Sequence, residues 1–294
     1  MKRSAYVALV TCFNEDETIN FAATRAQVRR QIAAGNNIMC CGTNGDFSAL
    51  THDEKIALCA AVMEEVAGRV NVIVNAGCPG TYETLQLARA VDAMGVHGIA
   101  VITPYFISCT QDGMIRHFRT VADAVTRPVY LYDIPARTQN HIEPATALAL
   151  ASHPNIRGIK DSGGSTETVL EYLEVARQVP GFEVFCAPDH LVHWGLQQGC
   201  AGVISGLGNV APDVLAAILS AFNAGDGVAA DAAQDIFAGL RKDLYALGFP
   251  PAMVKRALFA MDPSVGLSRQ PALLPDAAQD AAIAGILRKY GLTQ

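Results

Sequence analysis

The stretch Ile156-Arg-Gly-Ile-Lys160-Asp161-Ser162-Gly163-Gly164 decides how the rest of the chain is interpreted. An apolar run typical of a β-strand ends in a single lysine, and a turn of serine and glycine follows at once. In an all-parallel α/β architecture the C-terminal ends of the strands open onto the functional face, so we expect Lys160 at the mouth. Partial burial favours the uncharged amine, which is the form that attacks a carbonyl to make an imine. Taken alone, however, Lys160 is more simply explained as a strand-end lysine that reaches water.

Eight apolar, turn-bounded runs of this kind recur along the chain, and most of their starts lie about 26 to 32 residues apart, which is the size of a βα repeat. Runs that are apolar throughout and alternate with helical segments predict a parallel sheet that is covered on both faces. Eight such units predict a closed (β/α)8 TIM barrel rather than an open sheet. The runs are residues 6–11, 38–42, 70–77, 98–105, 128–135, 156–161, 182–188 and 201–206.

Helical periodicity fills the intervals and then continues alone after residue 206. The predicted domains are the barrel over residues 1–224 and a C-terminal helical extension over residues 225–294. The helices expected between strands are residues 21–34, 53–67, 82–94, 111–124, 143–151, 165–178 and 190–198. Those expected after the last strand are residues 213–224, 228–247, 252–261 and 276–290.

The composition favours a globular protein with a large core and argues against nucleic-acid-binding and membrane-spanning proteins. Only 17% of the residues are charged and 51% are hydrophobic, which predicts a large buried core. The net charge of -6 and the absence of any basic run argue against nucleic acid as a partner. No apolar stretch is long enough to span a membrane, and the N-terminus lacks a secretory pattern. The eight cysteines form no C-x-x-C pair, as expected of reduced thiols, and we therefore predict a cytoplasmic protein.

Polar groups gather at the predicted strand ends. Gly42-Thr43-Asn44-Gly45-Asp46 is a glycine-bounded turn whose backbone N–H groups can bind an anion such as a carboxylate. Tyr132 ends another strand and Arg137 follows five residues later, so a phenol can move a proton and a guanidinium can grip a carboxylate. Each of these side chains has a simpler structural explanation when it is taken singly.

Two other kinds of site match the sequence only in part. Gly206-Leu-Gly-Asn matches a loose dinucleotide-binding pattern, but it follows the eighth strand rather than the first. His190 and His193 lack a third ligand and the spacing of a catalytic zinc site. We therefore predict no nucleotide cofactor and no metal. In contrast, Thr51 and Glu54 fit a helix capping box, which assigns Glu54 a structural role.

At these positions the chain resembles the pyruvate-dependent class I aldolases typified by dihydrodipicolinate synthase and N-acetylneuraminate lyase. The resemblance covers nearly the whole chain and implies an enzyme, a Schiff-base lyase or aldolase acting on a 2-oxo acid, commonly as a homotetramer built as a dimer of dimers. The matching motifs are Gly42-Thr43-Asn44-Gly45-Asp46, Thr103-Pro104-Tyr105-Phe106, Tyr132-Asp133-Ile134-Pro135, Gly158-Ile159-Lys160-Asp161 and Gly202-Val203-Ile204-Ser205.

The resemblance also implies roles for individual residues. Lys160 would form the imine with pyruvate, Tyr132 would shuttle its proton and Thr43 would relay it. The turn residues Asn44 and Gly45 would help to hold the carboxylate of pyruvate. The remaining expected substrate-binding residues are Arg137, Ala187 and Ile204, and the covalent imine on Lys160 would make a metal or nucleotide unnecessary.

Three departures from the family pattern shape the substrate prediction. Phe106 stands where many relatives carry a relay tyrosine, and Asn44 and Asp46 replace a threonine and a glutamate. The run from Lys160 to Gly163 is similar to the sugar-acid aldolases, whereas Arg137 is shared with dihydrodipicolinate synthase. Because a phenyl ring cannot pass a proton, the leading prediction is C–C bond making or cleavage between pyruvate and an aldehyde on a sugar-acid-like 2-oxo acid.

Three alternatives stay open. The first is dihydrodipicolinate synthase itself, which condenses pyruvate with aspartate semialdehyde. The second is a 2-oxo acid dehydratase or deaminase that uses the same imine. The third is a non-catalytic 2-oxo acid binding protein, because a fold and part of a motif do not establish activity.

Overall fold

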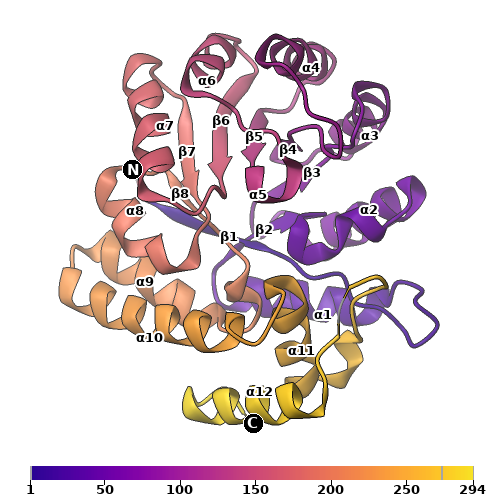
Figure 1. Ribbon diagram of the computed structural model, residues 1–294, viewed down its shortest axis with the longest axis vertical. Helices are drawn as coiled ribbons and strands as arrows, with labels where there is room; N and C mark the ends of the chain where they lie inside the picture. Colours follow the sequence, from indigo (N-terminus) through magenta and orange to yellow (C-terminus); the bar gives the residue numbers. More distant parts are fainter. Residues whose placement is uncertain (1, 273, 294) are drawn as a thin grey trace. The chain divides into compact units, whose positions relative to one another are not determined.

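The computed structural model describes residues 2–272 and 274–293, and its strands form the predicted barrel (Figure 1). The eight strands follow one another in sequence order around a closed barrel, and every strand pair described is parallel. The prediction of a (β/α)8 barrel with a C-terminal helical part is therefore confirmed. The strands are β1 (Ser4–Ala8), β2 (Asn37–Cys40), β3 (Val72–Asn75), β4 (Gly98–Ile102), β5 (Val129–Asp133), β6 (Ile156–Asp161), β7 (Glu183–Cys186) and β8 (Gly202–Ser205).

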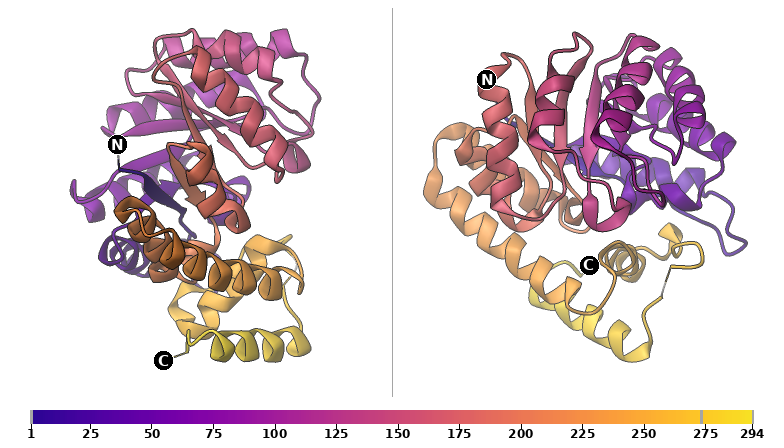
Figure 2. Two further views of the ribbon diagram at one scale, coloured as in Figure 1. Left: turned by 90° about the vertical axis from the view of Figure 1, so that its left-hand side faces the viewer. Right: turned by 45° about the horizontal axis from the view of Figure 1, so that its top comes forward.

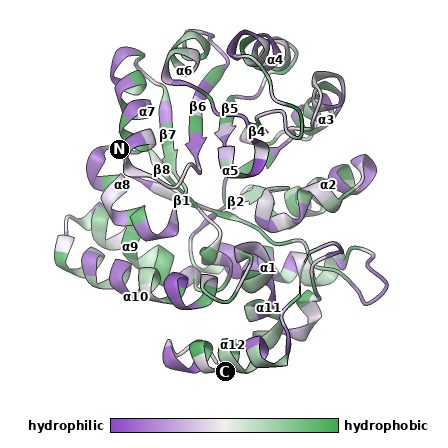
Figure 3. Cartoon of the chain, in the orientation of Figure 1, coloured by the Kyte–Doolittle hydropathy of each residue, from purple (hydrophilic) through white to green (hydrophobic). Residues whose placement is uncertain are grey.

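Burial explains why the strands appear in the sequence as continuous apolar runs. Every residue of β3, β4 and β8 is buried, because helices cover one side of each strand and the barrel interior covers the other. In β6 the buried run is broken only at Arg157, which is exposed. Figure 3 shows the arrowhead of β6 as hydrophilic, where Lys160 and Asp161 stand.

The chain divides into two compact units. One comprises the described residues of 71–204, and the other comprises those of 1–70 and 205–294. In the first unit neighbouring helices pack against one another in chain order outside the strands, α3 against α4, α4 against α6 and α6 against α7. Its helices are α3 (Thr81–Ala93), α4 (Gln111–Asp123), α5 (Pro135–Thr138), α6 (Pro144–Ala151), α7 (Thr166–Gln178), η3 (Asp189–Leu191) and α8 (Val192–Gln198).

The second unit holds β1 and β2, the first two helices and the whole C-terminal part. Helices α9 and α10 pack side by side, and α11 packs against α12 (Figure 2). The elements are α1 (Phe21–Ala33), η1 (Thr43–Gly45), η2 (Phe47–Ala49), α2 (His52–Val66), η4 (Leu207–Asn209), α9 (Pro212–Ala224), α10 (Gly227–Tyr245), α11 (Pro250–Met261), η5 (Pro263–Val265) and α12 (Ala277–Lys289).

The predicted helices are confirmed, with ends that move by a residue or two. The capping box is also present: the Thr51 hydroxyl accepts from the Glu54 N–H at 3.2 Å, and the Glu54 carboxylate accepts from the Thr51 N–H at 2.9 Å. Short α5 lies inside a run that the sequence assigned to a strand and a loop. The predicted boundary at residue 224 falls in the turn between α9 and α10, and the assignment of residues 225–294 to a separate extension stays a prediction.

The cysteines and the helices have the properties that the composition predicts. All eight cysteines are free thiols, and seven of them are buried. In the part of the chain that the structure describes, no helix combines the length and the apolar character that crossing a membrane requires.

Candidate active site

Lys160 and Tyr132 lie side by side at the ends of two neighbouring strands. Their Cα atoms are register partners between β6 and β5, and successive residues of a strand point to opposite faces, so both side chains point to the same face. The Lys160 Nζ lies 3.8 Å from the centroid of the Tyr132 ring. The exposed fraction is 4% for Lys160 and 1% for Tyr132. The predicted amine is therefore buried and in contact with the predicted phenol.

The next residue of β5, Asp133, points to the other face and accepts three hydrogen bonds. The donors are the Tyr172 hydroxyl at 3.1 Å, the Ile142 N–H at 3.0 Å and the His141 Nδ1 at 2.8 Å. The hydrogen bond that His141 donates to Asp133 raises the pKa of His141 above its usual value. These contacts fix the end of β5, and with it the backbone that carries Tyr132.

The next residue of β6, Asp161, holds the serine and glycine turn in the same manner. Its carboxylate accepts from the Gly163 N–H and from the Thr168 hydroxyl, each at 2.7 Å. Burial raises the pKa of Asp161, while these two hydrogen bonds act in the opposite direction. The Asp161 carbonyl also accepts the Ala187 N–H at 3.0 Å, which sets the start of the loop after β7.

The other predicted residues of this unit occupy strand ends and loops. Arg137 lies in α5, the short helix directly after β5, and its side chain is exposed. Ala187 follows β7, and Ile204 is a buried residue of β8. Thr103, at the end of β4, donates to the Thr138 hydroxyl at 2.9 Å and so ties the loop after β4 to α5.

Thr43, Asn44 and Gly45 form the single turn of η1 in the other unit. Gly45 is required there, because a Cβ at this position would lie 2.9 Å from the Leu9 carbonyl oxygen. The Thr11 hydroxyl donates to the Gly45 carbonyl at 2.6 Å and holds the turn from the loop after β1. The predicted anion-holding turn thus has a fixed backbone.

Asp46 ends this turn in the left-handed region, with φ of 54°. Its carboxylate lies 3.1 Å from the Nζ of Lys255, which also donates to the carbonyl of Thr11. Lys255 belongs to α11 and is buried. The sequence signal for this contact was the lone lysine before Arg256 in an otherwise apolar helix, and our prediction missed it.

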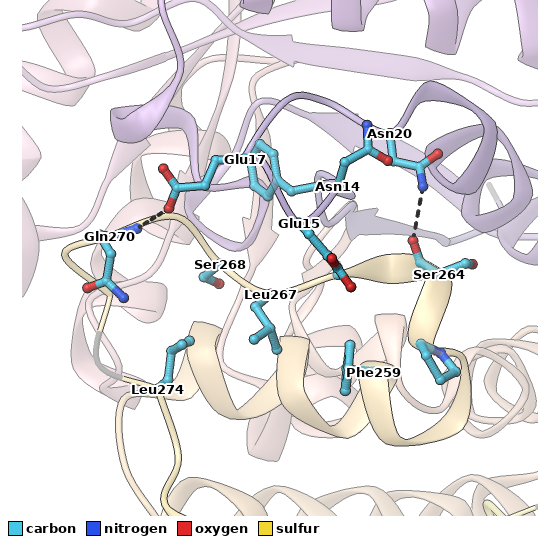
Figure 4. A pocket seen from close by; sticks show the side chains of 13 residues that line it. Asn14, Glu15, Glu17, Asn20, Phe259, Ser264, Leu267, Ser268, Gln270 and Leu274 are labelled. Carbon is cyan, nitrogen blue, oxygen red and sulfur yellow. Dashed lines mark hydrogen bonds between the residues drawn. The ribbon is translucent and has the colours of Figure 1, made fainter.

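A cavity of about 530 Å³ lies within this same unit, between the loop after β1 and the segment after α11 (Figure 4). Its lining combines apolar Phe13, Phe259 and Leu267 with acidic Glu15 and Glu17. None of the residues predicted to act on a 2-oxo acid lines it. The residues that line this cavity are therefore different from those predicted for the imine site.

Comparison with known proteins assigns the family. The profile of the "Dihydrodipicolinate synthetase family" matches residues 1–289. The chain is 34% identical to the 4-hydroxy-tetrahydrodipicolinate synthase of Geobacter metallireducens, over 99% of this chain and 100% of that protein. The chain belongs to the dihydrodipicolinate synthetase family.

Solved structures of the family superpose over nearly the whole chain. The dihydrodipicolinate synthase of Thermotoga maritima has a TM-score of 0.93 at 27% identity, covering 99% of both chains. YagE, a prophage protein of this family from E. coli K12 solved in complex with pyruvate, has a TM-score of 0.93 at 30% identity, also covering 99% of both. The predicted family of pyruvate-dependent class I lyases and aldolases is therefore confirmed, whereas the roles of the individual residues remain predictions.

Proposed function

We propose that Lys160 forms an imine with pyruvate and that this enzyme condenses the resulting nucleophile with an aldehyde. The observation that carries the proposal is the buried Lys160 amine in contact with Tyr132. The amine nitrogen adds to the keto carbon, the carbonyl oxygen leaves as water, and the protonated imine accepts the electron pair when C3 loses a proton. No metal or nucleotide takes part in this chemistry.

The surrounding residues take the roles that the family pattern implies. Tyr132 moves the proton at the imine, with Thr43 as the next member of the relay. The turn at Asn44 and Gly45 holds the carboxylate of pyruvate, since consecutive backbone N–H groups favour an anion. Ala187 and Ile204 line the pocket near the imine.

We infer that the aldehyde is aspartate semialdehyde, so that the activity is that of a 4-hydroxy-tetrahydrodipicolinate synthase. Relatives of that name support this alternative over the sugar-acid activity that the sequence led us to favour. The exposed guanidinium of Arg137 also supports it, because a planar fork binds the second carboxylate of this substrate in a bidentate manner.

Cleavage of a sugar-acid-like 2-oxo acid is the second candidate, and Phe106 favours it. Phe106 has no hydroxyl with which to continue a proton relay, and it stands where many relatives carry a tyrosine. Its φ is 76°, which a bulky residue rarely adopts, so the loop after β4 holds this ring in a strained conformation. A dehydratase or deaminase would use the same imine without breaking a C–C bond.

Reductive trapping tests the imine. Borohydride with pyruvate is expected to add one reduced pyruvyl group to Lys160, in a buffer that contains EDTA. Lys160→Ala removes the adduct, whereas the matched control Lys242→Ala, on an exposed lysine, retains it. A wild-type protein that gains no mass would instead support a 2-oxo acid binding protein.

Two coupled assays separate the candidate substrates. One follows condensation of pyruvate with aspartate semialdehyde, and the other follows pyruvate release from 2-keto-3-deoxy sugar acids. We expect turnover in the first, with a raised KM for the semialdehyde in Arg137→Ala. Turnover in the second assay alone would establish the sugar-acid activity, and Phe106→Tyr is expected to leave the rate of the first undiminished.

We further infer that the enzyme is a cytoplasmic homotetramer built as a dimer of dimers. Phe106 and Ile107 are adjacent large apolar residues with exposed fractions of 82% and 67%. Such a pair is best covered by a second copy of the chain. Light scattering on the purified protein measures the oligomeric state directly. Ile107→Asp is expected to shift the oligomeric state toward smaller species.

A further inference from the structure

Three cysteine thiols meet in a buried cluster next to the glycine-bounded turn. Cys40 is the last residue of β2, Cys41 follows it, and Cys59 comes from α2. The sulfur atoms are 3.7 Å apart for Cys40 and Cys41, 3.7 Å for Cys41 and Cys59, and 3.9 Å for Cys40 and Cys59. All three side chains are buried. We call these residues the trithiol cluster.

The sulfur separations match the spacing of thiolates on one metal ion. A tetrahedral ion with metal–sulfur bonds of about 2.3 Å holds its sulfur ligands about 3.8 Å apart, and a trigonal planar ion holds them about 4.0 Å apart. The sulfur atoms therefore need little movement to bind one ion. A disulfide would need two of them to approach to about 2.05 Å inside a packed core.

The charges around the trithiol cluster favour a divalent ion. Three thiolates carry three negative charges, a divalent ion supplies two positive charges, and the buried ammonium of Lys55, which acts electrostatically on Cys41, supplies the third. The cluster is then neutral overall, which lowers the cost of burying it. Thiolate ligands without carboxylates or waters select soft or borderline ions rather than magnesium or calcium.

The backbone at Cys41 also points to a function for the cluster. Cys41 has φ of 54°, an uncommon conformation for a residue other than glycine. With Cys41 in this conformation, the sulfur atoms of two consecutive cysteines lie 3.7 Å and 3.9 Å from the Cys59 sulfur on α2. Non-glycine residues in such conformations cluster at functional sites such as ligand clamps.

We propose that Cys40, Cys41 and Cys59 form a structural site for one thiophilic divalent ion of the zinc group. On binding, three S–H bonds are broken, three metal–sulfur bonds form and three protons leave to solvent, without any oxidation or reduction. The ion would tie the end of β2, and thus the start of the turn at Gly42, to α2.

A cadmium titration of the full chain tests the site, because cadmium thiolates absorb in the ultraviolet and free thiols do not. We expect one ion per chain and a thermal unfolding midpoint that rises with free cadmium, since an ion that binds only the folded state stabilises it. Cys59→Ser is expected to weaken binding more than about 100-fold, because even changes outside the ligands commonly cost 10- to 100-fold. Cys200→Ser, which removes a buried thiol outside the cluster, is expected to bind as the wild type does.

X-ray absorption of the zinc-loaded wild type tests the same site without any variant. The expected result is three sulfur neighbours at about 2.3 Å and at most one lighter ligand. One or two sulfur neighbours, or a cadmium signal that persists in Cys59→Ser, would overturn the proposal. A wild-type protein that binds no cadmium would show that the trithiol cluster is ordinary core packing.

Discussion

His117 provides a quantitative prediction of how the stability of this protein depends on pH. The residue lies on α4, its Nδ1 is 2.9 Å from the hydroxyl of Thr81 at the start of α3, and its Nε2 is buried without a hydrogen-bond partner among the described residues. Burial lowers the pKa of His117 from 6.5 to about 4. The folded protein therefore binds this proton less readily than the unfolded chain does.

The direction and size of the pH effect on stability follow from the linkage between proton binding and unfolding. Between the two pKa values the unfolded chain holds the proton and the folded chain does not, so the free energy of unfolding falls as the pH drops from 6.5 to about 4. A pKa difference of about 2.5, from 6.5 minus 4, corresponds to about 3 kcal/mol when fully developed. Between about pH 7 and about pH 4.5 the His117 contribution falls by about 2 kcal/mol.

Urea unfolding of the wild type and of His117→Gln at these two pH values isolates that contribution. Glutamine retains a hydrogen-bonding group for Thr81 but does not titrate, so the variant is expected to lose about 2 kcal/mol less than the wild type on acidification. His52→Gln, a partly exposed histidine at the start of α2, serves as the control and is expected to follow the wild type. Equal losses in the wild type and His117→Gln, or an NMR titration of His117 near 6.5, would refute the reasoning.

The remaining predictions concern the site and its supports. Tyr132→Phe is expected to lower kcat by about 10²-fold or more while borohydride still traps pyruvate on Lys160, because only proton transfer is lost; loss of trapping would contradict this role. Gly45→Ala places a Cβ 2.9 Å from a carbonyl oxygen, so it is expected to raise KM for pyruvate more than tenfold, and an unchanged KM would show that the turn does not bind the carboxylate. Arg269 pairs with Glu54 and lowers the pKa of Glu54 to about 2. Glu54→Gln breaks this ion pair, so it is expected to lower the thermal unfolding midpoint at neutral pH. Calorimetry should show that the difference in midpoint between the wild type and Glu54→Gln persists above about pH 4.5 and disappears as the pH falls toward about 2.

Most of the fold could be predicted because its signals are local. Strands buried on both faces leave continuous apolar runs, and the turns after them leave glycine and polar residues. The same regularity predicted that Lys160 and Tyr132 would meet, since parallel strands in register deliver their last residues to one face. The register Tyr132 to Lys160 confirms this contact.

The contacts that hold the site residues in place were not predictable in this way, since they join residues that are distant in sequence. Lys255 pairs with Asp46 across 209 positions, and Tyr172 reaches Asp133 across 39. Nothing in the run Tyr132-Asp133 indicates that His141 and Tyr172 bind its carboxylate, because helix packing decides which side chains arrive there. The trithiol cluster was missed for the same reason, although each cysteine was correctly expected to be reduced.

The buried ammonium of Lys255 limits how this protein can be shortened. A fragment that ended at residue 224, where the repeating βα pattern stops, would remove the cation that Asp46 and the Thr11 carbonyl share. It would leave a carboxylate and a carbonyl oxygen without their donor beside the turn expected to grip the substrate. We therefore expect activity to require α11, and any fusion or shortened form of the protein should retain it.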